Sequence, residues 1–187
     1  MRLTLWEGNM FKKEYTFNGS HAEKVKALVS KFADYSGSTI FQRNVDVLLI
    51  APIVGLLFGR TSTIDRSNSQ TTKIFVEQMI KEDLGIRFNF QLVTLLDKQV
   101  DYSNVQRIDA AFRFLGKDES QDQFTRYNEY ILGGVDVLYE KIIEPAKTEK
   151  DYLANLYDFL DDINDRYNDD IENDRVNELL ALARSQN

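Results

Sequence analysis

Of the side chains that most often act as nucleophiles, metal ligands or acid–base catalysts, this chain lacks the thiol and has the imidazole once. Among 187 residues there is no cysteine and a single histidine, His21. A chain without thiols excludes a disulfide framework, a cysteine-ligated zinc site, an iron–sulfur cluster and a thiol nucleophile. His21 lies two residues before Glu23 at the expected start of a helix, where Glu23 has a capping role. The pattern favours a structural role for His21.

Carboxylates are dense only near the C-terminus, in the segment DDINDRYNDDIEND over residues 161–174. An EF-hand loop needs oxygen ligands at fixed positions and a central glycine, and this segment contains no glycine. A di-iron site in a helical bundle needs Glu-x-x-His pairs on facing helices, which a single histidine cannot supply. The sequence therefore predicts no metal and no cofactor.

Sequence motifs of common enzyme classes are also missing. There is no Gly-x-Ser-x-Gly nucleophile elbow, and the glycines of GLLFG at 55–59 lack the Lys-Ser/Thr that makes a phosphate loop specific. Asp161 and Asp165 are paired at i, i+4, but in a segment that is acidic throughout. No catalytic residue is assigned, and an enzyme with a carboxylate-based site in the bundle stays open as a second alternative.

Basic residues gather near the N-terminus, interleaved with Phe11, Tyr15 and Phe17. Together with the arginines around residues 45–59 they would form the surface of a nucleic-acid-binding accessory protein, which is the first alternative hypothesis. The residues assigned to it are Lys12, Lys13, Lys24, Lys26, Arg43, Arg60 and Arg66. Against it, the acidic C-terminal segment would repel a duplex unless it points away.

The formal net charge of −7 comes entirely from the C-terminal segment. Residues 151–187 hold ten acidic and three basic residues, whereas the first 150 residues hold equal numbers of each sign. Such a segment is typical of a surface that binds a protein partner, or a second copy of the chain. The residues assigned to partner binding are Asp158, Asp161, Asp162, Asp165 and Tyr167.

An apolar stripe runs through the same segment at Leu156, Phe159, Leu160 and Ile163. At helical spacing such a stripe either completes the core or binds a helix in a groove. Core completion is the favoured interpretation for this stripe, while for Ile171 to Leu182 the two interpretations are balanced.

The most apolar stretch of the chain is VDVLLIAPIVGLLFG, residues 45–59. It is too short to span a membrane, which takes about 20 residues, and as a helix it would be buried nearly all round. Ala51, Gly55 and Gly59 are spaced by four, so they form a ridge that lets another backbone approach closely. One candidate for that backbone is the Gly133–Gly134 pair, which lies within a long predicted helix.

The remaining patterns predict further helices, a short N-terminal strand or extended arm near 13–17, and a surface loop at 61–70. Helices are expected over 21–34, over 72–84 with a stop at Gly85, over 86–96 and over 105–115. A long helix from residue 121 should end at Pro145, and another should begin near residue 148. Capping boxes are expected at Ser20, Ser103, Ser120 and Thr148.

The sequence thus predicts an all-α, single-domain bundle of about six or seven helices around the buried helix 45–59. Residues 1–147 are expected to form a helical core domain with an N-terminal arm. Residues 148–187 form an acidic helical segment packed on it or extending from it. The leading functional hypothesis is a cytoplasmic, non-catalytic accessory subunit of a larger bacterial assembly, with no membrane span.

Overall fold

The computed structural model describes residues 13–31 and 38–184, with side chains described as far as Tyr167. In chain order the elements are β1 (Tyr15–Asn18), α1 (Gly19–Leu28), α2 (Asn44–Leu57), β2 (Thr71–Ile74), α3 (Val76–Lys81), α4 (Asp83–Leu96), α5 (Asn104–Ile108), the π-helix η2 (Asp109–Arg113), the short 3-10 helix η3 (Asp118–Ser120), α6 (Gln121–Leu138), the π-helix η4 (Tyr139–Ile143) and α7 (Asp151–Arg184). The described part holds seven α-helices and one two-stranded sheet, which confirms the predicted helical class.

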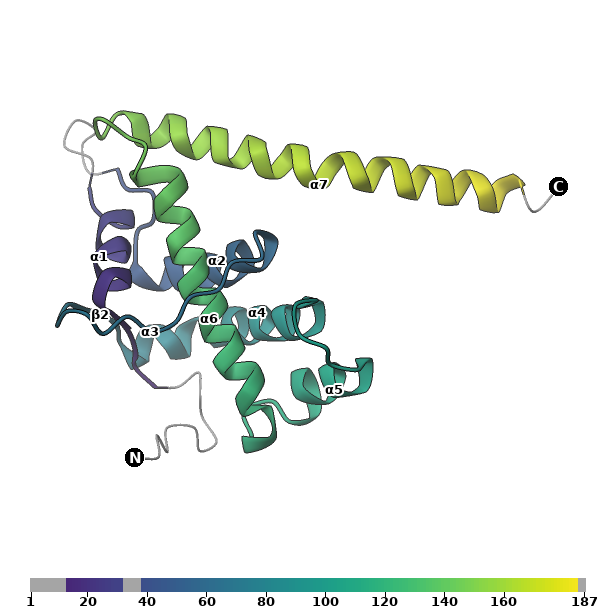
Figure 1. Cartoon of the computed structure of the whole chain (residues 1–187), viewed down its shortest axis with the longest axis horizontal. Coiled ribbons are helices and arrows are strands. Elements are labelled where there is room, and N and C mark those ends of the chain that lie inside the picture. Colours follow the sequence, from purple (N-terminus) through teal and green to yellow (C-terminus); the bar gives the residue numbers. More distant parts are fainter. Residues whose placement is uncertain (1–12, 32–37, 185–187) are drawn as a thin grey trace.

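Helices α2 and α6 cross at the centre of the molecule with their backbones in contact (Figure 1). A methyl group added at Gly134 would overlap the carbonyl oxygen of Ala51, and one at Gly55 would overlap the carbonyl oxygen of Tyr130. The predicted approach of the glycine pair to the small-residue ridge is therefore confirmed. Gly59 is the exception, because its neighbour is the side chain of Gln99.

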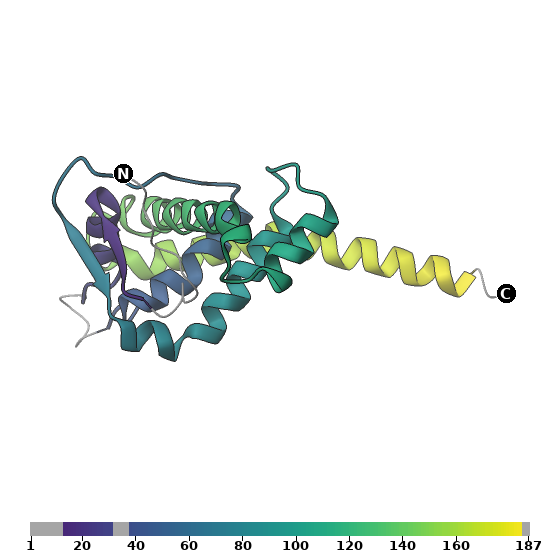
Figure 2. The ribbon, with the colours of Figure 1, turned by 90° about the horizontal axis from the view of Figure 1, so that it is seen from below.

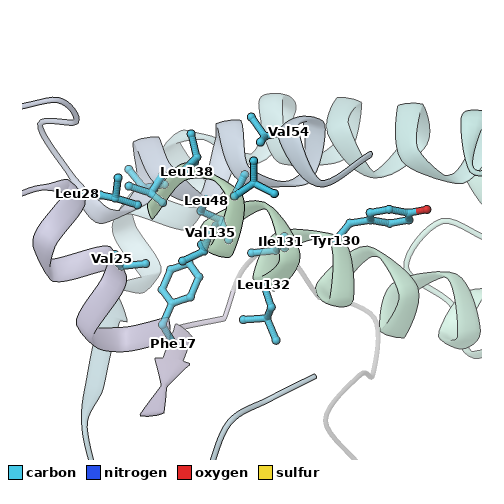
Figure 3. Packing of buried hydrophobic residues seen from close by; sticks show 14 of the residues in the cluster. Phe17, Val25, Leu28, Leu48, Val54, Tyr130, Ile131, Leu132, Val135 and Leu138 are labelled. Carbon is cyan, nitrogen blue, oxygen red and sulfur yellow. The ribbon is translucent and has the colours of Figure 1, made fainter. Parts of the chain in front are cut away.

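The hydrophobic core forms around this crossing (Figure 3). Its labelled members are Phe17 of β1, Val25 and Leu28 of α1, Leu48 and Val54 of α2, and Tyr130, Ile131, Leu132, Val135 and Leu138 of α6. The predicted central helix corresponds to α2, and Pro52 lies inside it. The expectation that this helix is buried nearly all round is wrong. One side of α2 lies at the surface, where Ile50 is 46% exposed.

The short sheet pairs the start of the chain with a segment that was expected to be helical. Strand β1, predicted as a strand or an arm, runs antiparallel to β2 with Phe17 opposite Thr72. Residues in β2 alternate between exposed and buried, and Ile74 is fully buried. The predicted single helix over 72–84 is wrong, since the pairing with β1 satisfies this backbone as a strand and helix α3 begins only afterwards.

The helix end predicted at Gly85 is also wrong. Gly85 was expected to end a helix but lies inside α4. The interruption falls instead at Glu82, between α3 and α4. A helix over 86–96 is confirmed, although the local alternation of apolar residues there also fitted a strand.

The predicted capping boxes have different outcomes. At Ser103 the box is present, since Ser103 Oγ accepts from the Gln106 amide (3.3 Å) and Gln106 returns a bond to the Ser103 amide (2.9 Å). At Ser20 the prediction is wrong, because α1 already begins at Gly19 and the Ser20 amide donates to Asp65 (2.8 Å). At Ser120 it is also wrong, since this hydroxyl donates to carbonyl oxygens that precede α6.

Two segments depart from the predicted helix bounds. The helix expected over 21–34 is α1, which ends at Leu28, and positions 32–34 lie outside the described residues. The acidic segment forms one helix, α7, rather than two. Its start matches the Thr148 pattern in part, since Asp151 accepts from the Lys147 and Thr148 amides (both 2.9 Å).

Helix α7 crosses the body and then runs beyond it (Figures 1 and 2). Within the ranges that the structure describes, no helix is both long and apolar enough to cross a membrane.

Candidate protein-interaction surface

The first half of α7 is anchored to the body by apolar packing and by two backbone-directed hydrogen bonds. Phe159 is buried and stacks on Phe58, with ring centroids 5.7 Å apart. Asn155 donates to the Ile142 carbonyl (2.9 Å), and the Tyr167 hydroxyl donates to the Leu57 carbonyl (2.7 Å). Core completion is thus confirmed for most of the predicted stripe, since Leu156 and Ile163 also pack against the core.

Asp162, one of the acids predicted to bind a partner, also faces the body. Its carboxylate accepts from Arg166 (2.9 Å) and lies 3.7 Å from the Lys141 ammonium group. The hydrogen bond from Arg166 holds the pKa of Asp162 below its usual range, and the Arg166 guanidinium lies over the Phe58 ring. Asp162 therefore helps to attach α7 to the body.

A second apolar row, which we call the outer row, lies on α7 beside the stripe that packs on the body. It consists of Leu153 (48% exposed), Tyr157 (70%), Leu160 (54%) and Tyr167 (36%). Spacings of four, three and seven residues place these side chains on one side of a helix. Leu160 was assigned to the body-facing stripe, and the structure places it here instead.

The remaining acids of the predicted partner site lie beside the outer row. Asp158, Asp161 and Asp165 are exposed, so three of the five predicted residues face solvent on the first half of α7. The structure thus divides the predicted set into an inward part, Asp162 and the Tyr167 hydroxyl, and an outward acidic part. Leu153 and Tyr157 were missed, although their spacing from Leu160 is the signal of a second apolar face.

Beyond Tyr167, α7 continues to Arg184 for about 25 Å at the usual helical rise. Figure 2 shows this part of the helix running clear of the other elements. Its sequence continues the acidic excess, with Arg175 and Arg184 as its only basic residues. The backbone of α7 beyond Tyr167 therefore leads away from the body.

A mostly apolar groove of about 430 Å³ adjoins the outer row at Tyr167. It is lined by Leu56, Leu57, Gly59, Leu96, Asp97, Lys98, Gln99, Tyr130 and Tyr167. The Tyr130 hydroxyl donates to Asp97 (2.6 Å), and Arg126 donates to the other oxygen of that carboxylate (2.9 Å). Burial, with the bond to Asp97, raises the pKa of Tyr130 to about 12. These groups are satisfied within the fold, and Asp97 and Tyr130 form one wall of the groove.

A buried polar cluster joins α1, the segment after α2, and α6. Asp136 accepts from Lys24 (2.6 Å) and from the Ser62 hydroxyl, and His21 Nε2 lies 3.3 Å from the same carboxylate. Burial alone would raise the pKa of Asp136, but the contacts from His21, Lys24 and Ser62 outweigh it and hold this pKa well below its usual range. The cluster therefore holds these three segments together by an ion pair and hydrogen bonds.

This cluster lacks the geometry of a serine hydrolase, although it unites serine, histidine and aspartate. A triad needs the imidazole at the hydroxyl, whereas here the carboxylate contacts Ser62, and a carboxylate of lowered pKa is a poor base. Both ring nitrogens of His21 are buried and make no hydrogen bond with the described residues. An open depression of about 470 Å³ borders His21 and Ser62, but the ring nitrogens are closed to a ligand there.

Several bases assigned to the nucleic-acid alternative are ion-paired within the chain. Lys24 pairs with Asp136, Arg43 with Asp46 (2.5 Å) and Glu82 (3.0 Å), and Arg60 with Glu140 (3.0 Å). Of the other assigned bases, Lys26 donates a hydrogen bond to Gln70 (3.1 Å), and Arg66 borders a surface depression. Lys13 is the first residue that the structure describes, so Lys12 lies outside the described residues. These pairs weaken the positive field that a nucleic acid would meet.

Among the side chains that the structure describes, over residues 13–31 and 38–167, there is no group of three or more histidine, aspartate or glutamate side chains arranged to hold a metal ion. Comparison of the chain with protein-family models, with curated proteins and with solved structures finds no match in any of the three.

Proposed function

We propose that this chain is a non-catalytic helical interaction subunit of a larger assembly, and that α7 is its docking element. The observation that carries the proposal is the outer row of α7, in which Tyr157 is 70% exposed and Leu160 54% exposed. Large apolar side chains in contiguous exposure mark binding surfaces. A cytoplasmic location is part of the proposal, because a chain without cysteine suits a reducing compartment.

The form of α7 supports the same proposal. An isolated helix in water is marginal unless it buries an apolar face, and the half of α7 beyond Tyr167 extends away from the body. Covering the outer row with a partner would remove apolar surface from water at about 25 cal/mol per Å². The outer row lies on the half of α7 that packs on the body, so a partner docked there would stabilise α7 where it leaves the body.

Photo-crosslinking from the outer row tests this function directly. The variant Tyr157→p-benzoylphenylalanine is expressed in the source cells, and illumination is expected to give one discrete adduct of the full-length chain. Its mass identifies either a second protein or a second copy of this chain. The adduct should disappear when Leu160→Asp is added, because a charge in the apolar contact disfavours docking.

The matched control places the same probe at position 84. Leu84 is 84% exposed and belongs to α4, which Figure 1 shows apart from α7, so it reports on general adhesion of apolar residues. The proposal predicts that the adduct from position 157 is not formed from position 84. No adduct from position 157, or the same set of adducts from both positions, would show that α7 is not a docking element.

A further inference from the structure

The geometry points to a specific kind of occupant for the outer row: we infer that α7 binds an amphipathic helix with an apolar face flanked by Lys and Arg. This inference rests on the proposed interaction function and adds the chemistry of the partner. Three observations carry it, namely the spacing of the row, the charges beside it and the apolar groove at its end.

The outer row has the spacing of a helix–helix seam. From Leu153 the positions of Tyr157, Leu160, Asn164 and Tyr167 alternate by four and three residues, which is the heptad pattern that keeps one apolar stripe facing a partner helix. Asn164 occupies one seam position, where a single polar residue can set register in coiled coils. A helix is therefore the complementary shape for this surface.

The charges beside the outer row indicate which charge a partner should carry. Asp158, Asp161 and Asp165 are exposed on this part of α7, whereas Arg166 is paired with Asp162 and lies over Phe58. A second α7 laid along the row would bring acid against acid, and like charges across a helix pair disfavour it. Lysine or arginine at the flanking positions of a partner would complement this edge.

The apolar surface does not end with the helix. Tyr167 belongs both to the outer row and to the groove of about 430 Å³, whose other apolar walls include Leu56, Leu57 and Leu96. Leu96 is 53% exposed at the rim. A helix aligned with the row thus meets apolar side chains from Leu153 to the groove, interrupted at Asn164.

Two synthetic helical peptides test the inference on the full-length chain. Both carry leucine at the seam positions of three heptads, with lysine at every flanking position in one and glutamate in the other. We expect the lysine peptide to bind at least about tenfold more tightly by fluorescence anisotropy at 50 mM NaCl, and to weaken at 500 mM NaCl as its ion pairs are screened.

Two variants and one control locate the contact. Leu160→Ser should weaken the lysine peptide about tenfold, Asp161→Lys should reverse the preference between the peptides, and Leu84→Ser should change neither affinity. Circular dichroism confirms that each variant is folded. The glutamate peptide binding as tightly as the lysine peptide, or unchanged affinity in Leu160→Ser, would overturn the inference.

Failure of the inferred partner chemistry can be distinguished from failure of the proposed function. If light scattering finds a dimer that Leu160→Ser dissociates, the row binds a second copy, and the basic partner is rejected while the interaction function stands. If neither peptide binds but position 157 still crosslinks to a protein, the partner chemistry is wrong and the function stands. The function is contradicted by the crosslinking outcomes alone, namely no adduct from position 157 or the same adducts from positions 157 and 84.

Discussion

Replacing Gly134 by alanine is expected to lower the free energy of unfolding by about 3 kcal/mol, at the upper end of overpacking effects. The added methyl would overlap the carbonyl oxygen of Ala51, and a backbone atom in the middle of α2 cannot rotate away as a side chain can. Helix propensity alone predicts the opposite sign, since alanine is favoured over glycine by about 1 kcal/mol in a helix interior. Urea unfolding followed by circular dichroism measures the change.

Gly85→Ala is the matched control for this prediction. Gly85 also lies inside a helix, but its nearest neighbour would be the end of the Leu49 side chain at 3.1 Å, which can shift. We expect this variant to range from neutral to about 1 kcal/mol more stable. If the two alanine variants had equal midpoints, close contact of the α2 and α6 backbones would not be what requires glycine at position 134.

Asp136→Asn is expected to cost about 3 kcal/mol at pH 7, because breaking a buried ion pair leaves its cation uncompensated. The Asp136 side chain is 9% exposed and pairs with Lys24. Its pKa in the folded protein lies below the usual value, so its contribution is present above pH 4 and decreases as the pH falls toward the folded pKa. The difference between wild type and variant should therefore narrow between pH 7 and pH 3.

Urea unfolding at both pH values measures that difference. Asp161→Asn is the control, since Asp161 is an exposed acid of α7 whose replacement should change stability by less than about 0.5 kcal/mol. A stability difference for Asp136→Asn that is the same at pH 7 and pH 3 would show that its charge does not contribute to folding.

The features that could be predicted from the sequence are those that local patterns determine. The contact between Gly134 and Ala51 follows from a ridge of small residues at helical spacing in α2 and an adjacent glycine pair in α6. The capping box at Ser103 depends on residues three positions apart. Strand β2 could not be predicted in this way, because its conformation depends on β1, which lies more than 50 positions earlier in the chain.

The candidate site could be predicted only in part for a related reason. Both faces of α7 carry apolar residues, so periodicity alone does not show which face meets the body. The stacking of Phe159 on Phe58 determines which face of α7 packs on the body. Leu153 and Tyr157 are then left exposed to solvent. Periodicity alone also does not show that the Asp162 carboxylate lies close to Lys141 of η4.

Because the first half of α7 is attached to the body, a small rotation of that half would move the far end of the helix over a larger distance. Its contacts with the body extend to Tyr167, and the tip lies about 25 Å beyond at the helical rise. A rotation of about 10° about the anchored half would carry the tip through about 4 Å over that length. A partner bound close to the body would then hardly move, whereas one that grips the tip would be displaced by the width of an atom or more.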